Sequence, residues 1–354
     1  MNSVRASAPQ LADITPYDPK YLPARAYLSA NENPCDVETE VRNEIKREIN
    51  KVAFNRYPDP YAVELCEKCA AFFGVDPSMV VAGNGSDELI GLIVSWFTEP
   101  GDTMAVVRPD FSMYSFYAQP CGLRLLAIDK DPDTLALDAD ALIARAREAD
   151  ARLLIFSNPC NPTSLAATRA DVLKIVDGLP GCLVVVDEAY MDFAEGSILR
   201  LAGERDNLIV LKTCSKAFGM AAIRLGFAVA NPVLIGAVKA AKSPYNVNSM
   251  TQAAGCVLFS HPDYLAGCAD EIKASRDALC RELSALAGEK SDILDVRPTC
   301  ANFVFLRLTD AKGVYEALLA RGIAVRLMGD RLRVSAGAPI ENRALLSTLR
   351  GLLR

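Results

Sequence analysis

Short apolar segments alternate with amphipathic segments through the middle of the chain. Six apolar segments have the length of strands, at positions 105–107, 123–128, 153–157, 183–186, 208–212 and 225–230. Between them, apolar residues recur at helical spacing at 138–148, 169–176 and 234–241. Segments that are apolar throughout are typical of strands buried on both faces, as in a mostly parallel sheet covered by helices. The pattern therefore predicts an α/β fold.

The two ends of the chain follow different patterns. Residues 1–35 are rich in Pro and Tyr and lack periodicity, which indicates an extended arm. Two helices are expected next, one from Val37 to Val52 with Asp36 as its cap and one that begins near Val63. After about residue 245 the expected elements are a long helix (263–286), a strand (302–308), a helix (311–321), two short strands (324–327 and 332–335) and a last helix from 341.

The length of 354 residues exceeds what one hydrophobic core usually serves, so we expect two domains. The changes of pattern divide the chain into an N-terminal arm over 1–35, a large domain over 36–245 and a small α+β domain over 246–354. We expect the arm to pack against the small domain or against a partner chain.

Composition excludes several classes of function. Charged residues make up 23%, the net charge is −6, and both signs are well mixed, which argues against nucleic-acid or anionic-membrane partners. The longest apolar run, 89–97, is far shorter than the ~18 residues of a membrane span. The single histidine, His261, excludes His-dependent triads and multi-His zinc sites and is expected to be structural. The chemistry must therefore use Lys, Asp, Tyr, Cys or a cofactor.

Eleven cysteines are spread through the chain without the spacing of a disulfide framework, and their number is odd. The N-terminus lacks the apolar core of a signal peptide. We expect free, mostly buried thiols and a reducing cytoplasm. Cys66 and Cys69 form an isolated C-x-x-C pair, which is expected to pack in the core rather than to bind a metal.

A lysine stands among hydroxyl groups directly after one expected strand. Lys216 lies between Ser215 and Gly219, and a desolvated amine of this kind suits Schiff-base chemistry with an aldehyde. Thr213, Ser215 and Arg224 have the chemistry to hold an anion such as a phosphate. A plain loop is the alternative.

A carboxylate ends another apolar strand. Asp187 follows 183–186, and Tyr190 comes three residues later. Ligands of open α/β sheets bind at this end of the strands. A buried Asp needs a cationic partner, and a protonated pyridine nitrogen would serve. A cap of the following helix is the alternative.

Two turn-like segments complete the candidate chemistry. Residues 83–88, Gly-Asn-Gly-Ser-Asp-Glu, open an expected helix, where backbone N–H groups and a Ser hydroxyl can cradle a phosphate. Residues 158–163 contain two Asn-Pro pairs, and Asn161 could donate to a phenolate-type oxygen. Taken alone, each segment is equally compatible with a simple turn.

These segments occur in a recognisable order along the chain: Arg-Tyr-Pro (56–58), Gly-Asn-Gly-Ser-Asp-Glu (83–88), Asn-Pro-Cys-Asn-Pro-Thr (158–163), Asp-Glu-Ala-Tyr (187–190), Ser-Lys-Ala-Phe-Gly (215–219) with Arg224, and Leu-Arg-Val-Ser (332–335). With this order the chain resembles the fold-type I pyridoxal-phosphate aminotransferases, from Tyr17 to Arg333. Within them it is most similar to the histidinol-phosphate aminotransferases, through 30–34, 56–60, 83–90 and 244–248.

The resemblance implies pyridoxal 5′-phosphate as cofactor and a role for each matching residue. Lys216 would hold the cofactor as an internal aldimine and carry the proton, with Asp187 under the pyridine nitrogen. Tyr190 and Asn161 would bond the O3′ atom, and Phe111 would stack on the ring. The phosphate cup would consist of Gly85, Ser86, Asp87, Thr213, Ser215 and Arg224.

The remaining roles concern the substrate and the partner subunit. Tyr57 would reach the phosphate of the neighbouring subunit's cofactor, which implies a homodimer with shared active sites. Arg333 would grip the substrate carboxylate or its anionic end, and Tyr17, Asn31 and Arg326 would be further substrate contacts. Alternation along two paired strands would aim Arg326 and Arg333 into one cleft.

The implied reaction is ping-pong transamination between histidinol phosphate and 2-oxoglutarate, a step of histidine biosynthesis. The alternatives are a threonine-phosphate decarboxylase, another amino-acid aminotransferase such as an aromatic one, and a non-catalytic binding protein on the same fold. A nicotinamide-dependent dehydrogenase would need a G-x-G-x-x-G segment, which the chain lacks.

The chain departs from the family pattern at four positions: Ser164 where Gly is usual, Cys160 where Asn is usual, Cys214 inside the Lys loop, and Phe111 where Tyr is more usual. If the usual Gly has a positive φ, Ser164 carries strain of about 1 kcal/mol. None of the four replaces the Lys, Asp, Tyr or Arg required by the reaction.

Overall fold

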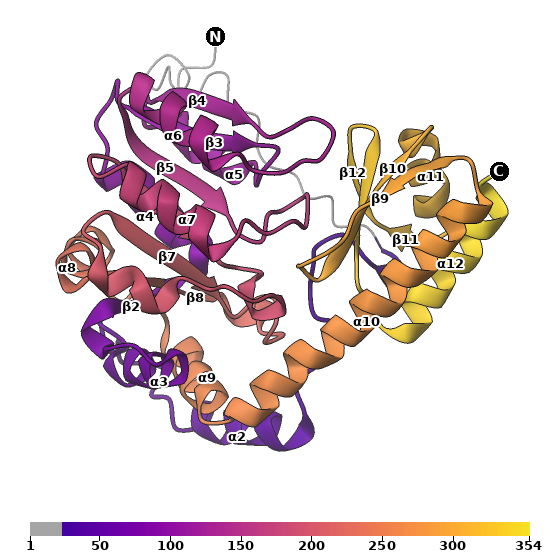
Figure 1. Ribbon diagram of the computed structural model, residues 1–354. Helices are drawn as coiled ribbons and strands as arrows, with labels where there is room; N and C mark the ends of the chain where they lie inside the picture. Colours follow the sequence, from indigo (N-terminus) through magenta and orange to yellow (C-terminus); the bar gives the residue numbers. More distant parts are fainter. Residues whose placement is uncertain (1–22) are drawn as a thin grey trace, which may run out of the picture.

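A seven-stranded sheet forms the centre of the computed structural model, which describes residues 23–354 (Figure 1). Its strands, in sheet order, are β2 (Val80–Asn84), β8 (Leu225–Val229), β7 (Leu208–Thr213), β6 (Leu183–Asp187), β5 (Ala151–Ser157), β3 (Thr103–Arg108) and β4 (Arg124–Asp129). The strands from β7 to β4 are parallel, and β8 is antiparallel to both of its neighbours. The carboxyl ends of β5, β6 and β7 therefore meet at one edge of the sheet.

Helices cover both faces of this sheet, as the apolar strands require. One layer consists of α4 (Ser86–Trp96), α5 (Met113–Ala118) and α8 (Pro232–Ala241). The other contains α3 (Val63–Phe73), α6 (Ala139–Glu148), α7 (Arg169–Gly178) and α9 (Ser249–Phe259). Successive residues of a strand alternate between the two cores: Leu153 and Ile155 face the first, whereas Leu154 and Phe156 face the second.

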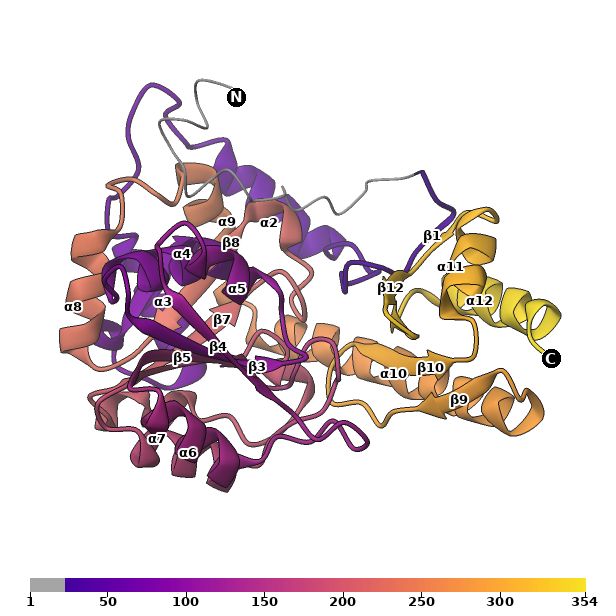
Figure 2. The same ribbon diagram turned by 90° about the horizontal axis from the view of Figure 1, so that it is seen from above.

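The C-terminal third of the chain builds a second, smaller sheet. The long helix α10 (Pro262–Glu289) leads from the large sheet to it (Figures 1 and 2). The sheet has the antiparallel order β12 (Arg326–Met328), β13 (Arg331–Ser335), β10 (Phe303–Leu308), β9 (Ile293–Val296), and it packs with α11 (Ala311–Leu319) and α12 (Pro339–Leu352). The segment after residue 22 joins this part, because β1 (Ala26–Tyr27) pairs in parallel with β11 (Ile323–Ala324). The described end of the arm thus lies against the C-terminal part of the chain.

Most expected elements are present, with a few corrections. The helix α2 (Thr39–Ile49) begins after Glu38, and Asp36 does not cap it. The carboxylate of Asp36 instead accepts a hydrogen bond from the Val37 amide and pairs with Arg42, so the predicted cap is wrong. The expected strand at 324–327 is divided between β11 and β12. Among the strands and α-helices of residues 23–354, the sequence pattern missed β1, β2, α5, α9 and β9.

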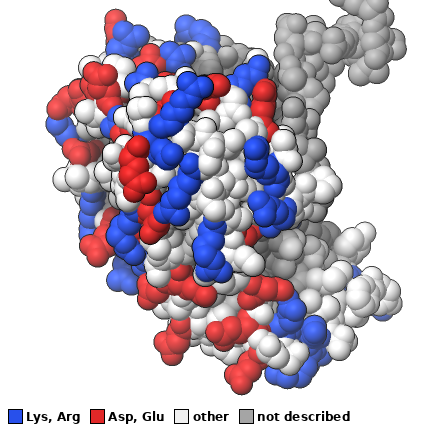
Figure 3. All heavy atoms as spheres, turned by 90° about the vertical axis from the view of Figure 1, so that its right-hand side faces the viewer, with Lys and Arg blue, Asp and Glu red and all other residues white. Residues whose placement is uncertain are grey.

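The other compositional expectations concern thiols, charge and membranes. All eleven cysteines are free thiols, and Cys66 and Cys69 are buried on α3. His261 precedes α10, and its Nε2 atom lies 2.9 Å from the Glu44 carboxylate. Acidic and basic side chains are interspersed on the face around the C-terminal elements (Figure 3). Within residues 23–354 no helix is long and apolar enough to cross a membrane.

Candidate active site

A cavity of about 270 Å³ lies where the carboxyl ends of β5, β6 and β7 meet the small sheet. Thirteen of the residues selected from the sequence line it: Asn31, Ser86, Asp87, Phe111, Asn161, Asp187, Tyr190, Thr213, Ser215, Lys216, Arg224, Arg326 and Arg333. They come from segments spread over some three hundred positions of the chain. Parallel strands bring their ends, and the loops that follow them, to one crevice of the sheet. The structure thus assembles the motifs into one site.

The Lys216 amine is the candidate nucleophile of this cavity. It lies in the loop after β7, and its Nζ atom donates a hydrogen bond of 2.9 Å to the carbonyl oxygen of Ala30. Burial, with the nearby cation of Arg333, lowers the pKa of the Lys216 amine to about 8. A considerable fraction of the amine is therefore neutral near physiological pH, which nucleophilic and general-base chemistry both require.

The Asp187 carboxylate lies at the end of β6 and is only 4% exposed. Its Oδ2 atom accepts a hydrogen bond of 2.8 Å from the Tyr114 hydroxyl, and its Oδ1 atom accepts one from the Ala189 amide. Burial raises the pKa of Asp187 to about 6, although the Tyr114 hydrogen bond opposes the rise. Within the described part of the chain, no Lys or Arg forms an ion pair with this carboxylate. It is therefore suited to receive a cationic group, such as a protonated ring nitrogen.

Donors for an anion surround the opposite part of the cavity. Ser86 begins α4, Ser215 follows β7, and the Arg224 guanidinium lies 3.4 Å from both the Ser215 hydroxyl and the Asp87 carboxylate. Gly85 does not line the cavity but stands directly before Ser86, which does. Its φ is +80°, and an added Cβ atom would lie 2.8 Å from Arg224 Nη2, so both the backbone and the space favour glycine. A helix N-terminus, two hydroxyls and a guanidinium form a suitable phosphate cradle.

On the side of the cavity that faces the small sheet, hydrogen bonds connect the lining residues to one another. The Asn31 side-chain amide donates to the Tyr190 hydroxyl at 2.9 Å, and its backbone N–H donates to Ser335. Arg333 donates to the Asn161 side-chain oxygen at 2.6 Å and to the Ser29 carbonyl oxygen. The chain near Asn31 is thereby fixed to both the large and the small sheet.

Arg326 and Arg333 lie side by side, as the alternation of the two strands predicts. They are register partners of the antiparallel pair β12 and β13, and both line the cavity. Side chains of directly paired residues project from the same face of a sheet, so two guanidinium groups reach one cleft. Arg326 thus lines the cavity together with Arg333, and its role towards a substrate stays a prediction.

Besides Gly85, the described residue Tyr57 was predicted for the site but does not line this cavity. Tyr57 is 80% exposed and stacks on Tyr245, with ring centroids 4.5 Å apart. Its expected role at a neighbouring subunit's site thus requires another chain and stays a prediction. Tyr17 lies outside the residues that the structure describes.

Several residues of the cavity were not predicted from the sequence. Tyr114 is the most informative, because it bonds Asp187 directly and its ring lies edge-on to Phe111, with centroids 5.5 Å apart. Ser157, Ser29, Ala30 and Ala189 also line the cavity. The only signal for Tyr114 was its position three residues after Phe111, which places it one helical turn further on.

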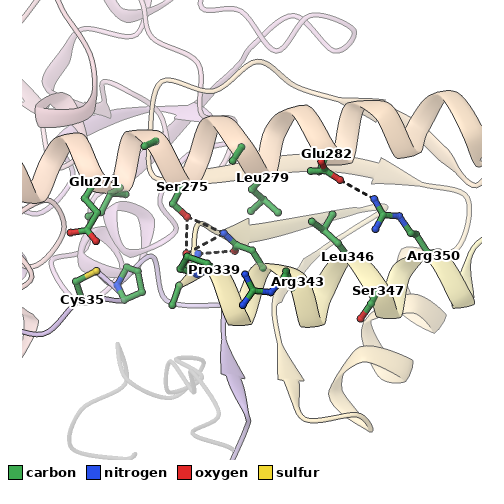
Figure 4. Close-up of a pocket in the computed structure, with 17 residues that line it drawn as sticks. Cys35, Glu271, Ser275, Leu279, Glu282, Pro339, Arg343, Leu346, Ser347 and Arg350 are labelled. Carbon is green, nitrogen blue, oxygen red and sulfur yellow. Dashed lines mark hydrogen bonds and ion pairs between the residues drawn. The ribbon is translucent and has the colours of Figure 1, made fainter.

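A larger groove, of about 720 Å³, lies between α10 and α12 (Figure 4). Apolar side chains such as Leu279 and Leu346 line its centre, and an ion pair between Glu282 and Arg350 closes one end. None of the residues selected from the sequence lines this groove within the described chain. Size alone therefore does not identify the site, whereas the grouping of reactive side chains does.

Comparisons with known proteins agree with this arrangement. Residues 26–349 match the family model of the class I and II aminotransferases. A histidinol-phosphate aminotransferase of Clostridium kluyveri is 38% identical over 349 residues, which cover 97% of each protein. That of Thermococcus gammatolerans is 37% identical and covers 92% of this chain and 91% of the relative.

Two solved structures illustrate the shared fold. The histidinol-phosphate aminotransferase of Sinorhizobium meliloti in complex with pyridoxal-5′-phosphate has a TM-score of 0.87 at 23% identity and covers 97% of each chain. The L-threonine-O-3-phosphate decarboxylase of Porphyromonas gingivalis has a TM-score of 0.79 at 20% identity, and the match covers 92% of this chain and 98% of that one. At these identities the structures support the fold alone.

Proposed function

Because the chain belongs to the class I and II aminotransferases, we propose that it transfers the amino group of histidinol phosphate to 2-oxoglutarate, with pyridoxal 5′-phosphate as its cofactor. Relatives that are 33–38% identical over nearly the whole chain carry the name of this activity. The observation that carries the proposal is that Lys216, Asp187 and the Arg326–Arg333 pair line one cavity.

The residues present fit this cofactor by their own chemistry. The cradle of Ser86, Ser215 and Arg224 offers donors for the phosphate, and the buried Asp187 carboxylate offers a partner for a protonated pyridine nitrogen. When bound, pyridoxal phosphate supplies a sink for the electrons released at the substrate's α-carbon. Phe111, Tyr190 and Asn161 line the cavity; in this proposal Phe111 stacks on the planar ring, and Tyr190 and Asn161 hydrogen-bond its phenolic oxygen.

Lys216 has the roles of nucleophile and proton carrier in this proposal. Its neutral amine can take a proton from the substrate carbon that bears the amino group. It can then return this proton to the reactive carbon of the cofactor. An ammonium group would be unable to accept that proton, so the lowered pKa of Lys216 is part of the function. The 2.9 Å bond to the Ala30 carbonyl oxygen holds the amine inside the cavity.

Arg326 and Arg333 account for the anionic substrates. Histidinol phosphate carries a phosphate, and 2-oxoglutarate carries two carboxylates, so each half-reaction brings an anion to the same cleft. Charge-assisted bonds from two neighbouring guanidinium groups suit both kinds of anion. Asn31, and Tyr17 in the arm, are further proposed substrate contacts.

The proposed assembly is a cytoplasmic homodimer in which Tyr57 completes the partner's phosphate site. The exposed stack of Tyr57 on Tyr245 supports this, because it presents an aromatic surface away from the chain's own cavity. The proposed division of the chain remains an arm over 1–35, a large domain over 36–245 and a small domain over 246–354.

A second candidate is the decarboxylation of a phosphorylated amino acid, because a threonine-phosphate decarboxylase shares the fold. The products distinguish the two. An aminotransferase forms glutamate only when 2-oxoglutarate is present, whereas a decarboxylase releases carbon dioxide without a 2-oxo acid. The purified protein should be assayed for both products with histidinol phosphate, phosphothreonine and aromatic amino acids.

The assignment of Lys216 is tested separately by borohydride reduction of the cofactor-loaded protein. The reduced cofactor should be found on the peptide that contains Lys216, and Lys216→Ala should lose both this label and nearly all turnover. Lys212→Ala is no suitable control, because Lys212 forms a buried ion pair with Asp192. The half-buried Lys239 on α8 is suitable, and Lys239→Ala should keep label and turnover. A label on another lysine would refute the assignment.

A further inference from the structure

Two reactive side chains, Lys130 and Cys160, lie outside the active-site cavity and have no part in the proposed transamination. The Lys130 amine follows β4 and the Cys160 thiol follows β5, and their Nζ and Sγ atoms are 2.8 Å apart. Lys130 is 7% exposed and Cys160 is 3% exposed. Even an N–H···O hydrogen bond is typically ~2.9–3.0 Å long, and sulfur is the larger atom. The two groups are therefore unusually close.

The groups around Lys130 and Cys160 indicate that this contact does not arise from packing alone. A buried ammonium normally faces a carboxylate. Within residues 23–354, however, the Cys160 thiol is the hydrogen-bond partner of Lys130 Nζ, and no carboxylate lies within ion-pair distance of it. The nearby Asp110 carboxylate is occupied by hydrogen bonds from Ser157 and from the Phe111 amide. Cys160 also stands where the family that the chain resembles usually has Asn.

The backbones of both residues are fixed. The Lys130 amide donates to the Arg108 carbonyl oxygen at 2.8 Å, and the Cys160 amide donates to the Leu165 carbonyl oxygen at 2.8 Å. The Cys160 carbonyl oxygen in turn accepts from the Ser164 amide. Side chains on such anchored segments meet repeatedly in one geometry, which favours a reaction between them.

Both side chains also line a cavity of about 300 Å³ beside Leu135 and Leu137. A water molecule occupies ~30 Å³ in the liquid, so this space admits a peroxide or dioxygen molecule without local unfolding. The buried thiol thus faces a space that a small neutral oxidant can occupy.

We propose that Lys130 and Cys160 form a site of oxidative modification, at which one oxygen atom joins Nζ of Lys130 to Sγ of Cys160. Two single bonds of about 1.5 Å that meet at a bent oxygen atom span nearly the separation observed here. A direct nitrogen–sulfur bond would require the two atoms to approach each other by more than an ångström. The geometry therefore favours the bridge that contains oxygen.

The reaction balances with a peroxide as oxidant. One peroxide molecule accepts two electrons from the Cys160 sulfur: its O–O bond breaks, an S–OH group forms and water leaves. A second peroxide oxidises the neutral Lys130 amine to N–OH in the same way. The oxygen of this N–OH group then attacks Sγ, and the hydroxyl group on sulfur leaves as a further water. In total, a thiol, an amine and two peroxides give the N–O–S bridge and three waters.

The rate of this reaction is limited by the thiol. Burial, together with the Asp110 charge, raises the pKa of the Cys160 thiol above its usual value, while Lys130 opposes the rise. Thiolates react with peroxide and thiols do not, so the bridge should form slowly under sustained oxidant exposure. The site differs in this respect from fast peroxide sensors, whose cysteines have lowered pKa values.

The test uses the full-length wild-type protein, incubated with excess hydrogen peroxide that contains oxygen-18. After the free thiols are blocked, a digest should contain one new species that joins the peptides of Lys130 and Cys160. Its mass should equal the sum of the two peptides plus one labelled oxygen less two hydrogens. Dithiothreitol should separate it into the two peptides.

Matched variants identify the two atoms. Cys160→Ser and Lys130→Met should each abolish the species, whereas Cys182→Ser should leave it unchanged, because the buried Cys182 thiol bonds only a backbone carbonyl. The proposal is wrong if wild-type Cys160 is recovered only as a thiol or a sulfur acid, or if a cross-link lacks oxygen-18. It is also wrong if Lys130→Met forms the same species. The decisive readout needs only the wild-type chain and does not depend on the proposed function.

Discussion

Replacement of Tyr114 by Phe should change the pH dependence of cofactor binding while leaving the packing of the site intact. The substitution removes only the hydroxyl that donates to Asp187 Oδ2 at 2.8 Å. The ring remains, edge-on to Phe111. Since the hydroxyl stabilises the carboxylate form, its loss leaves the buried Asp187 with a weaker preference for its anion.

The magnitude follows from the strength of this bond. A hydrogen bond to a charged group contributes ~1.5–3 kcal/mol, and one pKa unit corresponds to about 1.4 kcal/mol. The pKa of Asp187, raised by burial to about 6 in the native protein, should therefore rise by a further ~1–2 units in Tyr114→Phe. The carboxylate is needed to bind a protonated pyridine, so affinity falls as the pH drops through this pKa. The fall should begin at higher pH in the variant.

The assay is equilibrium dialysis of pyridoxal phosphate against the apoprotein between pH 5 and pH 9. Tyr117→Phe on the same helix is the matched control, because Tyr117 does not line the cavity. The two variants should differ most between the native and shifted midpoints and should converge at high pH. A Tyr114→Phe protein with the native acid midpoint, or with an equal loss of affinity at every pH, would refute the reasoning.

Two further predictions concern the substrate and the partner subunit. Arg326→Ala should raise KM for histidinol phosphate roughly 10- to 100-fold, because it removes a charge-assisted bond of ~1.5–3 kcal/mol. It should change KM for an unphosphorylated amino acid little, and Arg307→Ala, whose guanidinium pairs with Asp330 outside the cavity, should change neither. Equal losses for both substrates would show that Arg326 does not recognise the phosphate. Mixed dimers of Tyr57→Phe and Lys216→Ala chains should regain one intact site, and turnover no higher than that of the parent variants would contradict a shared site.

The strands were predictable where they are buried on both faces. Six of the seven strands of the large sheet contain apolar runs; the five inner strands are covered by helices on both faces, whereas β4 at one edge is partly exposed. The exception, β2 (Val80–Asn84), has three apolar residues before Gly83 and Asn84 and lies at the edge of the sheet. Its three apolar residues are as many as in the expected strand 105–107, but Gly83 and Asn84 belong to the turn-like segment 83–88, which obscured the strand. The helix α9 (Ser249–Phe259) was missed because apolar residues occupy most of its circumference, so its periodicity is weak.

Site residues were predictable from the sequence where a reactive side chain stands at the end of an apolar strand. Asp187 and Lys216 follow apolar strands, and parallel strands bring such residues together whatever their distance in sequence. Tyr114 could not be found in this way. It lies on a helix of six residues and contacts Asp187 across 73 positions, and no local pattern encodes that contact. The same holds for Lys130 and Cys160, which follow β4 and β5 on either side of β3 and are 30 positions apart.

At Ser164, a contact with a residue distant in sequence alters the energetic cost that the local backbone alone would predict. Its φ is +64°, which meets the condition under which a strain of about 1 kcal/mol is expected of a residue in place of Gly. The side chain is also fully buried, and its hydroxyl pairs with that of Thr299, 135 positions away. This bond offsets the strain, since a buried hydrogen bond contributes ~0.5–1.5 kcal/mol.

The two effects can be separated by two substitutions at this one position. Ser164→Gly relieves the strain and loses the hydrogen bond, so the free energy of unfolding should change by less than ~1 kcal/mol. Ser164→Ala keeps the strain and loses the hydrogen bond, so it should destabilise the protein by ~1 kcal/mol more than Ser164→Gly does. Urea unfolding of the three proteins at the same cofactor load measures the difference. If the Ala and Gly variants are equally stable, the positive φ of Ser164 stores no strain, and the hydroxyl pair with Thr299 alone determines which residue is favoured there.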